Sequence, residues 1–316
     1  MKFAAVFPGQ GSQSVGMLSA LATDEACVRD TFAEAADVLG YDLWALAQTG
    51  PEDTLKQTEI TQPLMFVSGV ACWRAWQARG GSVPACAAGH SLGEYAALVA
   101  TGAFGYADAL EVVALRGTLM SKSVPAGEGG MAAILGLDDE VVIDLCESLT
   151  GDRVVEAVNF NSPSQVVISG HVDALEAACA EAKNRGAKRA LMLPVSVPNH
   201  SSLMGGVVAA LAAAIDRVDS RMPTVPVLQN AEATDLPTLD AVLSSLKAHV
   251  VNPVRWTTTL QAMRARGVEA VVEFGPGKVL SGLAKRTDRQ FVLHSVDDPA
   301  GLDAAVEAVA SLEAQP

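Results

Sequence analysis

Short apolar runs alternate with amphipathic stretches along most of the chain. Residues 2–7 and 85–88 are compact apolar runs typical of buried strands, whereas residues 24–39 repeat apolar positions at helical spacing. The same reading predicts further strands at 225–230 and 268–274, and further helices at 62–79, 94–99, 106–120, 201–218, 241–249 and 257–266. Alternating strands and helices predict an α/β domain with a mostly parallel sheet covered on both faces.

The order of predicted strands and helices changes after residues 123–130, whose Ser-Val-Pro-Ala-Gly-Glu-Gly-Gly sequence is typical of a hinge. The elements expected there are a strand at 131–136, a helix at 138–149, strands at 154–159 and 165–169, a helix at 172–185 and a strand at 190–195. This β-α-β-β-α-β order is the ferredoxin-like pattern. We therefore expect a ferredoxin-like insert domain of residues 126–196 within a large, hydrolase-like α/β domain of residues 1–125 and 197–316.

Composition and charge narrow the class of protein. Half of the 316 residues are hydrophobic and 18% are charged, so the chain can bury a sizeable core. The formal net charge of −14 argues against binding to nucleic acid or to an anionic membrane surface. We find no signal peptide and no apolar run of membrane-spanning length, and expect a cytoplasmic protein. The five cysteines have neither metal-binding nor redox spacing.

The sequence Gly-His-Ser-Leu-Gly at 89–93 lies between a strand of small residues and an apolar helix. A glycine on each side of a serine lets the chain turn sharply from strand to helix, which exposes the serine hydroxyl. The helix N-terminus favours a negative charge that develops there. Ser91 is therefore a candidate nucleophile, with an ordinary glycine-rich turn as the alternative.

A serine nucleophile needs a base, and the chain has five histidines. His200 is best placed, because it lies where the chain re-enters the large domain after the insert. His294 follows a late predicted strand and is a competing candidate. His90, His171 and His249 are expected to have structural or helix-end roles.

Arg116 lies among apolar residues of the predicted helix 106–120. Such an arginine either extends its charge to the surface or is an interior cation that awaits a carboxylate. The sequence pattern alone does not choose between these two interpretations.

Seven segments together resemble the malonyl-CoA:acyl carrier protein transacylases and, more broadly, the acyltransferase domains of fatty acid and polyketide synthases. They run in order from near residue 7 to residue 278 and comprise Phe-Pro-Gly-Gln-Gly-Ser-Gln (7–13), Gly-His-Ser-Leu-Gly-Glu (89–94), Arg-Gly with a later Met (116–120), Asn-Phe-Asn-Ser-Pro (159–163), residues 195–200, Asn-Pro-Val-Arg-Trp (252–256) and Phe-Gly-Pro-Gly-Lys (274–278).

The resemblance implies roles for the matched positions. Ser91 would be the nucleophile and His200 its base. The other implied site residues are the backbone N–H groups of Gln10 and Leu92 for the oxyanion, Arg116 for the malonyl carboxylate, Met120, Asn161 and Asn199 for the substrate, and the backbone carbonyl at His249 for orienting the base. Many relatives have Gln at the position of His249, and Ser or Phe is common at that of Asn199, so these two positions depart from the family's pattern.

The resemblance also implies the reaction and its partners. Malonyl-CoA, a coenzyme A thioester, would acylate Ser91, and the phosphopantetheine thiol of an acyl carrier protein would then take the malonyl group in a ping-pong reaction that supplies fatty acid synthesis. No bound cofactor or metal is implied, and a monomer is the default expectation.

Acyl carrier proteins are acidic, so an acidic enzyme needs a local basic patch to dock one. Two clusters qualify: Lys183, Arg185, Lys188 and Arg189 in the insert, and Lys278, Lys285, Arg286 and Arg289 in the large domain. We predict carrier docking at Lys188, Arg189, Lys285 and Arg286, with solvated helix ends as the alternative.

Three other functions remain open at this stage. The chemistry would be unchanged in a malonyl transferase of malonate decarboxylase or of a polyketide pathway. A serine thioesterase or esterase would share the nucleophile but would not need Arg116. A non-catalytic carrier-binding module would not need the pair of Ser91 and His200.

Overall fold

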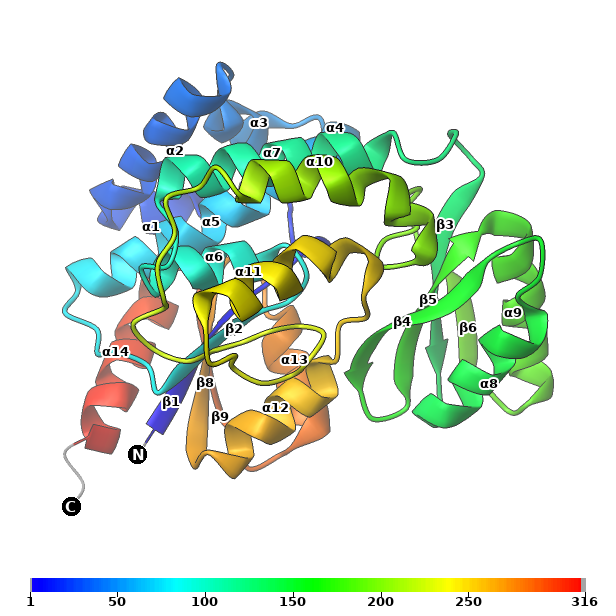
Figure 1. Ribbon diagram of the computed structural model, residues 1–316. Coiled ribbons are helices and arrows are strands. Elements are labelled where there is room, and N and C mark those ends of the chain that lie inside the picture. The colour runs from blue at the N-terminus through cyan, green and yellow to red at the C-terminus, as the bar shows by residue number, and fades with distance from the viewer. Residues whose placement is uncertain (1, 314–316) are drawn as a thin grey trace.

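The computed structural model describes residues 2–313, which form a large α/β unit and a smaller unit beside it (Figure 1). The large unit contains a five-stranded parallel sheet in the order β7-β2-β1-β8-β9. Its strands are β1 (Lys2–Phe7), β2 (Cys86–Gly89), β7 (Val227–Leu228), β8 (Val268–Phe274) and β9 (Val292–Val296). The predicted α/β class with a mostly parallel sheet is confirmed.

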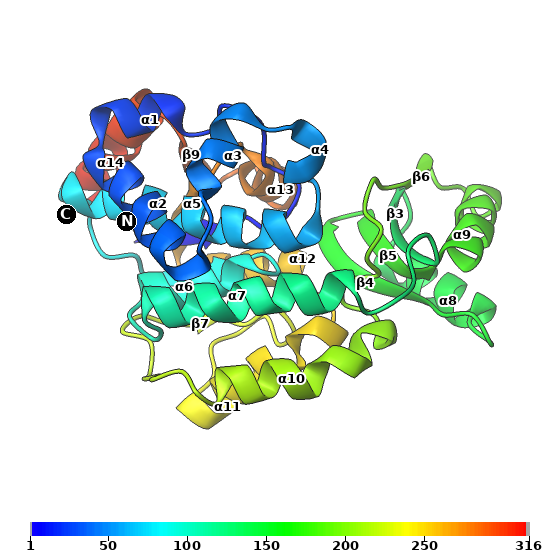
Figure 2. The ribbon, with the colours of Figure 1, turned by 90° about the horizontal axis from the view of Figure 1, so that it is seen from above.

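Helices cover both faces of this sheet, which explains why its strands read as nearly continuous apolar runs. They are α1 (Ser19–Asp24), α2 (Ala26–Leu39), α3 (Leu43–Thr49), α4 (Glu52–Leu55), α5 (Thr58–Ala78), α6 (Gly93–Ala100), α7 (Tyr106–Ser121), α10 (Gly205–Ile215), α11 (Leu239–Ala248), α12 (Trp256–Ala265), α13 (Val279–Thr287) and α14 (Pro299–Glu313), with short 3₁₀ helices η1 (Ser202–Met204) and η2 (His249–Val251). Figure 2 shows α10 and α11 on one side of α7, and α1 to α5 on the other.

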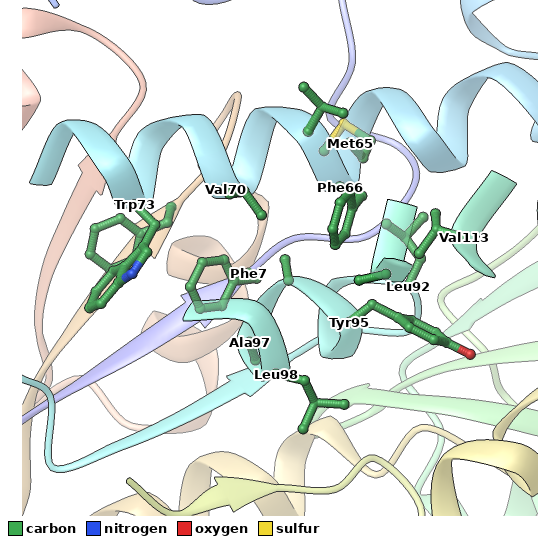
Figure 3. Packing of buried hydrophobic residues seen from close by; sticks show 14 of the residues in the cluster. Phe7, Met65, Phe66, Val70, Trp73, Leu92, Tyr95, Ala97, Leu98 and Val113 are labelled. Carbon is green, nitrogen blue, oxygen red and sulfur yellow. The ribbon is translucent and has the colours of Figure 1, made fainter. Parts of the chain in front are cut away.

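The two faces of β1 belong to two separate cores. Phe3, Ala5 and Phe7 join the core under α5 and α6, whereas Ala4 and Val6 pack with residues of α12 and α13. Figure 3 shows Phe7 between α5 and α6, near Trp73 of α5. This packing fixes the carboxyl end of β1, which leads directly into the residues at 8–10.

The smaller unit is a four-stranded antiparallel sheet in the order β4-β5-β3-β6 with two helices on one face. Its elements are β3 (Gly129–Leu135), α8 (Asp139–Leu149), β4 (Val155–Ser162), β5 (Gln165–His171), α9 (Val172–Asn184) and β6 (Arg189–Met192). This is the ferredoxin-like arrangement, as predicted. Its helix-covered face has its own core, and Met131, Val158 and Val167 lie on the other face.

Backbone hydrogen bonds tie the insert to the large unit. Phe160 N donates to Val254 O (2.9 Å), and Val254 N donates to Val158 O (2.8 Å). The insert is thus fixed to the segment that follows η2.

The structure differs from the sequence-based expectations at several elements. The helix expected from residue 62 begins at Thr58, so Pro63 lies inside α5 rather than in its first turn. Because most residues of α5 are buried, tertiary packing outweighs the one backbone hydrogen bond that proline cannot make. The pattern did not predict α1, α3, α4, α13 or α14, and the strand expected at 225–230 is only two residues long.

Candidate active site

The sequence at 89–93 forms the predicted sharp turn from strand to helix. β2 ends at Gly89, α6 begins at Gly93, and Ser91 has φ +51° in the left-handed region. A Cβ at position 89 would lie 1.9 Å from the carbonyl carbon of Gly93, and one at position 93 would lie 2.2 Å from Phe7 O. Both glycines are therefore required for the close approach that exposes the Ser91 hydroxyl.

Ser91 contacts the histidine expected to serve as its base. Ser91 Oγ lies 2.7 Å from His200 Nε2, and His200 Nδ1 lies 3.1 Å from both His249 O and Asn252 O. Carbonyl oxygens only accept hydrogen bonds, so Nδ1 carries the ring proton. This leaves Nε2 free to accept the proton of Ser91.

The surroundings of His200 keep its imidazole neutral. Burial, followed by the positive charge of Arg116, lowers the pKa of His200 to about 3. The neutral ring is the form that can act as a base. The His249 ring lies 5.0 Å from that of His200, centre to centre, is itself buried and has no hydrogen-bond partner on either nitrogen in the described part of the chain.

Arg116 is a buried cation and does not reach the surface. Its side chain is almost fully enclosed, at 1% exposure. Nη1 donates to Gln62 Oε1 (2.6 Å) and Nη2 donates to Ser91 Oγ (3.2 Å), whereas Nε has no partner among residues 2–313. Within that range no carboxylate forms a salt bridge with Arg116, which leaves a buried positive charge beside the nucleophile.

A cavity of about 190 Å³ opens above these side chains, between the large unit and the open face of the insert sheet. Its lining includes these residues from the site predicted above: Gln10, Ser91, Leu92, Arg116, Asn161, Asn199 and His200. The backbone N–H groups of Gln10 and Leu92 are not engaged in hydrogen bonds within the described chain, so both are available as donors.

Of the three residues expected to contact the substrate, Asn161 and Asn199 line the cavity and Met120 does not. Asn161 Oδ1 accepts a hydrogen bond from His90 Nε2 (2.7 Å), and Asn199 Nδ2 lies 3.6 Å from Met131 Sδ. Met120 does not line the cavity, and its sulfur accepts from Gln62 Nε2 (3.5 Å). Met120 therefore contacts Gln62, the hydrogen-bond partner of Arg116, and does not reach the cavity as the expected substrate contact would.

The competing histidines lie elsewhere. His294 is within β9 rather than after a strand, is half-buried and does not line the cavity. His171 precedes α9 and accepts a hydrogen bond from Val154 N at Nδ1 (2.9 Å). His200 is thus the histidine that contacts Ser91.

One residue of each basic cluster, Arg286 and Arg189, can be placed relative to Gln165 at one end of the insert sheet. Arg286 of α13 donates from Nη1 to Gln165 Oε1 (2.7 Å), and Gln165 lines the cavity. Leu135 of β3 is paired with Gln165 on one side and with Arg189 on the other. Paired residues of antiparallel strands share a face, so Arg189 faces the same side of the sheet as Gln165.

Three groups of the site were not predicted from the sequence. They are the side chain of Gln62, which contacts Arg116, the backbone carbonyl of Asn252, which contacts His200, and the side chain of Asn230, whose Oδ1 accepts from Ser91 N (2.9 Å). Gln62 and Asn230 are far from residues 89–93 along the chain. Only the fold brings them to the serine, and the sequence offers no local signal for this.

A serine activated by a neutral histidine, with free amides and a cation around it, defines an enzyme of the serine-nucleophile acyl-transfer class. The family model described as "Acyl transferase domain" matches residues 5–311, and the chain belongs to this family.

Named relatives are similar over nearly their whole length. A malonyl CoA-acyl carrier protein transacylase of Salmonella typhimurium is 49% identical over 305 residues, which cover 96% of this chain and 99% of the relative. An acyl carrier protein S-malonyltransferase from Vibrio cholerae has a crystal structure that superimposes with a TM-score of 0.93 at 49% identity, over 96% of this chain and 99% of that one. A malonyl-transacylase solved in complex with a type II polyketide acyl carrier protein has a TM-score of 0.95 at 46% identity, over 98% of this chain and all of that one. The resemblance inferred from the seven segments is confirmed.

No helix among residues 2–313 has the length and apolar character needed to cross a membrane. Within the same residues, His, Cys, Asp and Glu side chains do not gather in any group of three that could hold a metal ion.

Proposed function

We propose that this enzyme transfers a malonyl group from malonyl-CoA to the phosphopantetheine thiol of an acyl carrier protein through a malonyl-Ser91 ester. The observation that carries the proposal is the triangle of Arg116, Ser91 and His200. Ser91 Oγ is 2.7 Å from the base and 3.2 Å from a buried guanidinium that lacks a carboxylate partner in the described chain.

Acylation begins when Ser91 Oγ bonds to the thioester carbonyl carbon and its proton moves to His200 Nε2. The carbonyl oxygen becomes an oxyanion, which the N–H groups of Gln10 and Leu92 are available to bind. The carbon–sulfur bond then breaks, and coenzyme A leaves as a thiol with the proton from His200. The backbone carbonyls of His249 and Asn252 hold the imidazolium in place during this step.

Deacylation is the same sequence with a different thiol. The carrier's phosphopantetheine thiol gives its proton to His200 and attacks the malonyl carbonyl carbon. Collapse of the second intermediate breaks the bond to Ser91 Oγ, which regains its proton. No bound cofactor is needed for either half-reaction.

Arg116 would recognise the free carboxylate of the malonyl group. A guanidinium offers planar paired donors that match a carboxylate, and an acetyl group leaves that buried charge unpaired. Asn161 and Asn199 line the same cavity and would contact the acyl group or the thioester arm.

The carrier would dock at Lys188, Arg189, Lys285 and Arg286. The contact of Arg286 with Gln165 at the cavity wall supports this placement.

We also propose that residues 126–196 are a domain in their own right, supported by the separate core of the insert. Five free thiols agree with a cytoplasmic location.

Mass spectrometry after incubation with malonyl-CoA tests the central step. We expect a malonyl adduct on Ser91 of the wild type, no adduct on S91A, and transfer of the adduct to a purified carrier in its phosphopantetheine form. Release of free malonate at the same rate with and without carrier would instead indicate a thioesterase. Comparing fatty acid and polyketide carriers assigns the pathway.

A further inference from the structure

The side chain of Asn230 lies directly behind the nucleophile. β7 is the neighbour of β2 in the parallel sheet, so the residues that follow the two strands meet at the same edge. Asn230 Oδ1 accepts from Ser91 N (2.9 Å), and Asn230 Nδ2 donates to Gly89 O (2.8 Å). One buried amide therefore holds the chain on both sides of residue 90.

Glu94, in the first turn of α6, fixes the orientation of that amide. Glu94 Oε2 accepts from Asn230 N (2.9 Å) and also from Asn230 Nδ2. If the amide were flipped, its NH₂ group would face the N–H of Ser91, and its oxygen would face two acceptors. Only the observed orientation satisfies the three groups that face the amide, namely Ser91 N–H, Gly89 O and Glu94 Oε2, so Glu94 helps to fix which end of Asn230 reaches the nucleophile.

We propose that Asn230 and Glu94 form a positioning pair for Ser91. The pair holds the Ser91 backbone in a left-handed conformation that residues with a Cβ rarely adopt. It also engages the Ser91 N–H, so that this group faces Asn230 and the Oγ stays in line with His200 Nε2. Neither side chain lines the cavity or touches the reacting atoms, so both are positioning residues. This inference rests on the proposed function of Ser91.

The surroundings of Glu94 support this role. Its side chain is 1% exposed, and within residues 2–313 its hydrogen bonds are all with Asn230. Burial raises the pKa of Glu94 to about 7, against the opposing effects of Asn230 and Arg116. Burying an isolated carboxyl group lowers the stability of a fold. Holding the turn at Ser91 through Asn230 is a function that accounts for a buried carboxyl at position 94. Protonation leaves an acceptor oxygen on Glu94, so the pair does not depend on its charge.

The first test measures the rate constant for acylation of N230A at saturating malonyl-CoA, normalised to the fraction of Ser91 that becomes acylated. We expect a loss of about 100-fold in this rate constant with little change in KM, because a misplaced nucleophile slows chemistry more than binding. N230D should be at least as slow, because its second oxygen would face Gly89 O and the Glu94 carboxyl.

Gln229 provides the matched control. It is the neighbouring buried amide, and its Nε2 donates to Val227 O (3.1 Å) and not to the serine turn. Q229A should lower the thermal midpoint as N230A does while keeping the wild-type acylation rate. Equal slowing in Q229A and N230A would reduce the role of Asn230 to general stability and would overturn the proposal.

The second test compares two substitutions at Glu94. E94Q keeps an acceptor oxygen for Asn230 and should retain most of the acylation rate, whereas E94A should approach N230A. The double variant E94A/N230A should be no slower than N230A alone, since the two residues act through one contact. If N230A does not fold, the ratio of the acylation rate constants of E94Q and E94A tests the positioning role by itself. Equal rates for E94Q and E94A would contradict the inference, whereas absence of an adduct on wild-type Ser91 would contradict the proposed function itself.

Discussion

The guanidinium of Arg116 contacts the nucleophile directly, with Nη2 3.2 Å from Ser91 Oγ. Because Arg116 donates this hydrogen bond, the hydroxyl proton of Ser91 is directed to His200 Nε2 at 2.7 Å. The same cation lowers the pKa of His200, after the larger effect of burial. If Arg116 binds the malonyl carboxylate as proposed, it would link recognition of an anionic acyl group to the protonation state of His200.

Replacing Arg116 should change which acyl group the enzyme prefers. We expect R116A to lower kcat/KM for malonyl-CoA by about 100-fold or more and to leave that for acetyl-CoA unchanged or higher, because the unpaired charge no longer penalises acetyl. R116K keeps the charge without the planar pair of donors, so its preference for malonyl-CoA should lie between those of the wild type and R116A. Steady-state kinetics with both thioesters measure this, and an unchanged malonyl preference would favour an esterase.

The acylation rate should not follow an ordinary histidine titration. The pKa of His200 in the folded enzyme is lowered from 6.5 to about 3, so its base form persists as the pH falls below 6.5. Activity should therefore be lost on acidification only as the pH approaches about 3, or when the protein unfolds. R116A removes a nearby positive charge and should raise this pKa. Pre-steady-state acylation measured across pH checks both results, and a midpoint near 6.5 in the wild type would contradict the assignment.

The His249 side chain should cost stability. Both ring nitrogens are buried without a partner in the described chain, and a buried unsatisfied polar group costs about 1–3 kcal/mol. H249L keeps the backbone carbonyl and should raise the free energy of unfolding by an amount of this order. Chemical denaturation measures it, and a large loss of stability in H249L would show that the imidazole has a partner in solution.

The same residue gives a pH dependence of known sign. Burial lowers the pKa of His249 well below 6.5, so below that pH the unfolded chain binds a proton that the folded one does not. The penalty for keeping this ring unprotonated is thus absent above pH 6.5, and it grows as the pH falls from 6.5 towards the folded pKa. The free energy of unfolding of H249L should decline less on acidification than that of the wild type. His90, whose pKa burial also lowers, remains in both proteins as an internal reference.

Local patterns predicted the parts of the site that local geometry determines. The glycines at 89 and 93 are needed for the strand-to-helix turn whatever surrounds it, so Ser91 could be found from five residues. The β-α-β-β-α-β order located the insert, and the position of His200 after it followed.

Parts of the site that depend on packing were not predictable. The apolar neighbours of Arg116 fit both a surface and an interior arginine, and only the packing of α5 against α7 shows that it is buried beside Gln62. Asn230 and the carbonyl of Asn252 come from segments far along the chain from Ser91 and His200 respectively. The helices α1, α3 and α4 were missed because one or two turns are too few for a periodic pattern.

Charge reversal at the insert edge should separate the two half-reactions. K188E/R189E removes two exposed cations at the edge of the insert sheet, of which Arg189 lies on the same side of the sheet as Gln165, while the residues of the site, Ser91, His200 and Arg116, are unchanged. We expect transfer from malonyl-Ser91 to the acidic carrier to slow by about tenfold or more at low salt, with the difference shrinking as salt screens the contact. Acylation by malonyl-CoA should stay near the wild-type rate. R217E, on an exposed arginine after α10, is the matched control and should affect neither step. Equal losses in both half-reactions of K188E/R189E would show that these cations act on the site itself and do not dock the carrier.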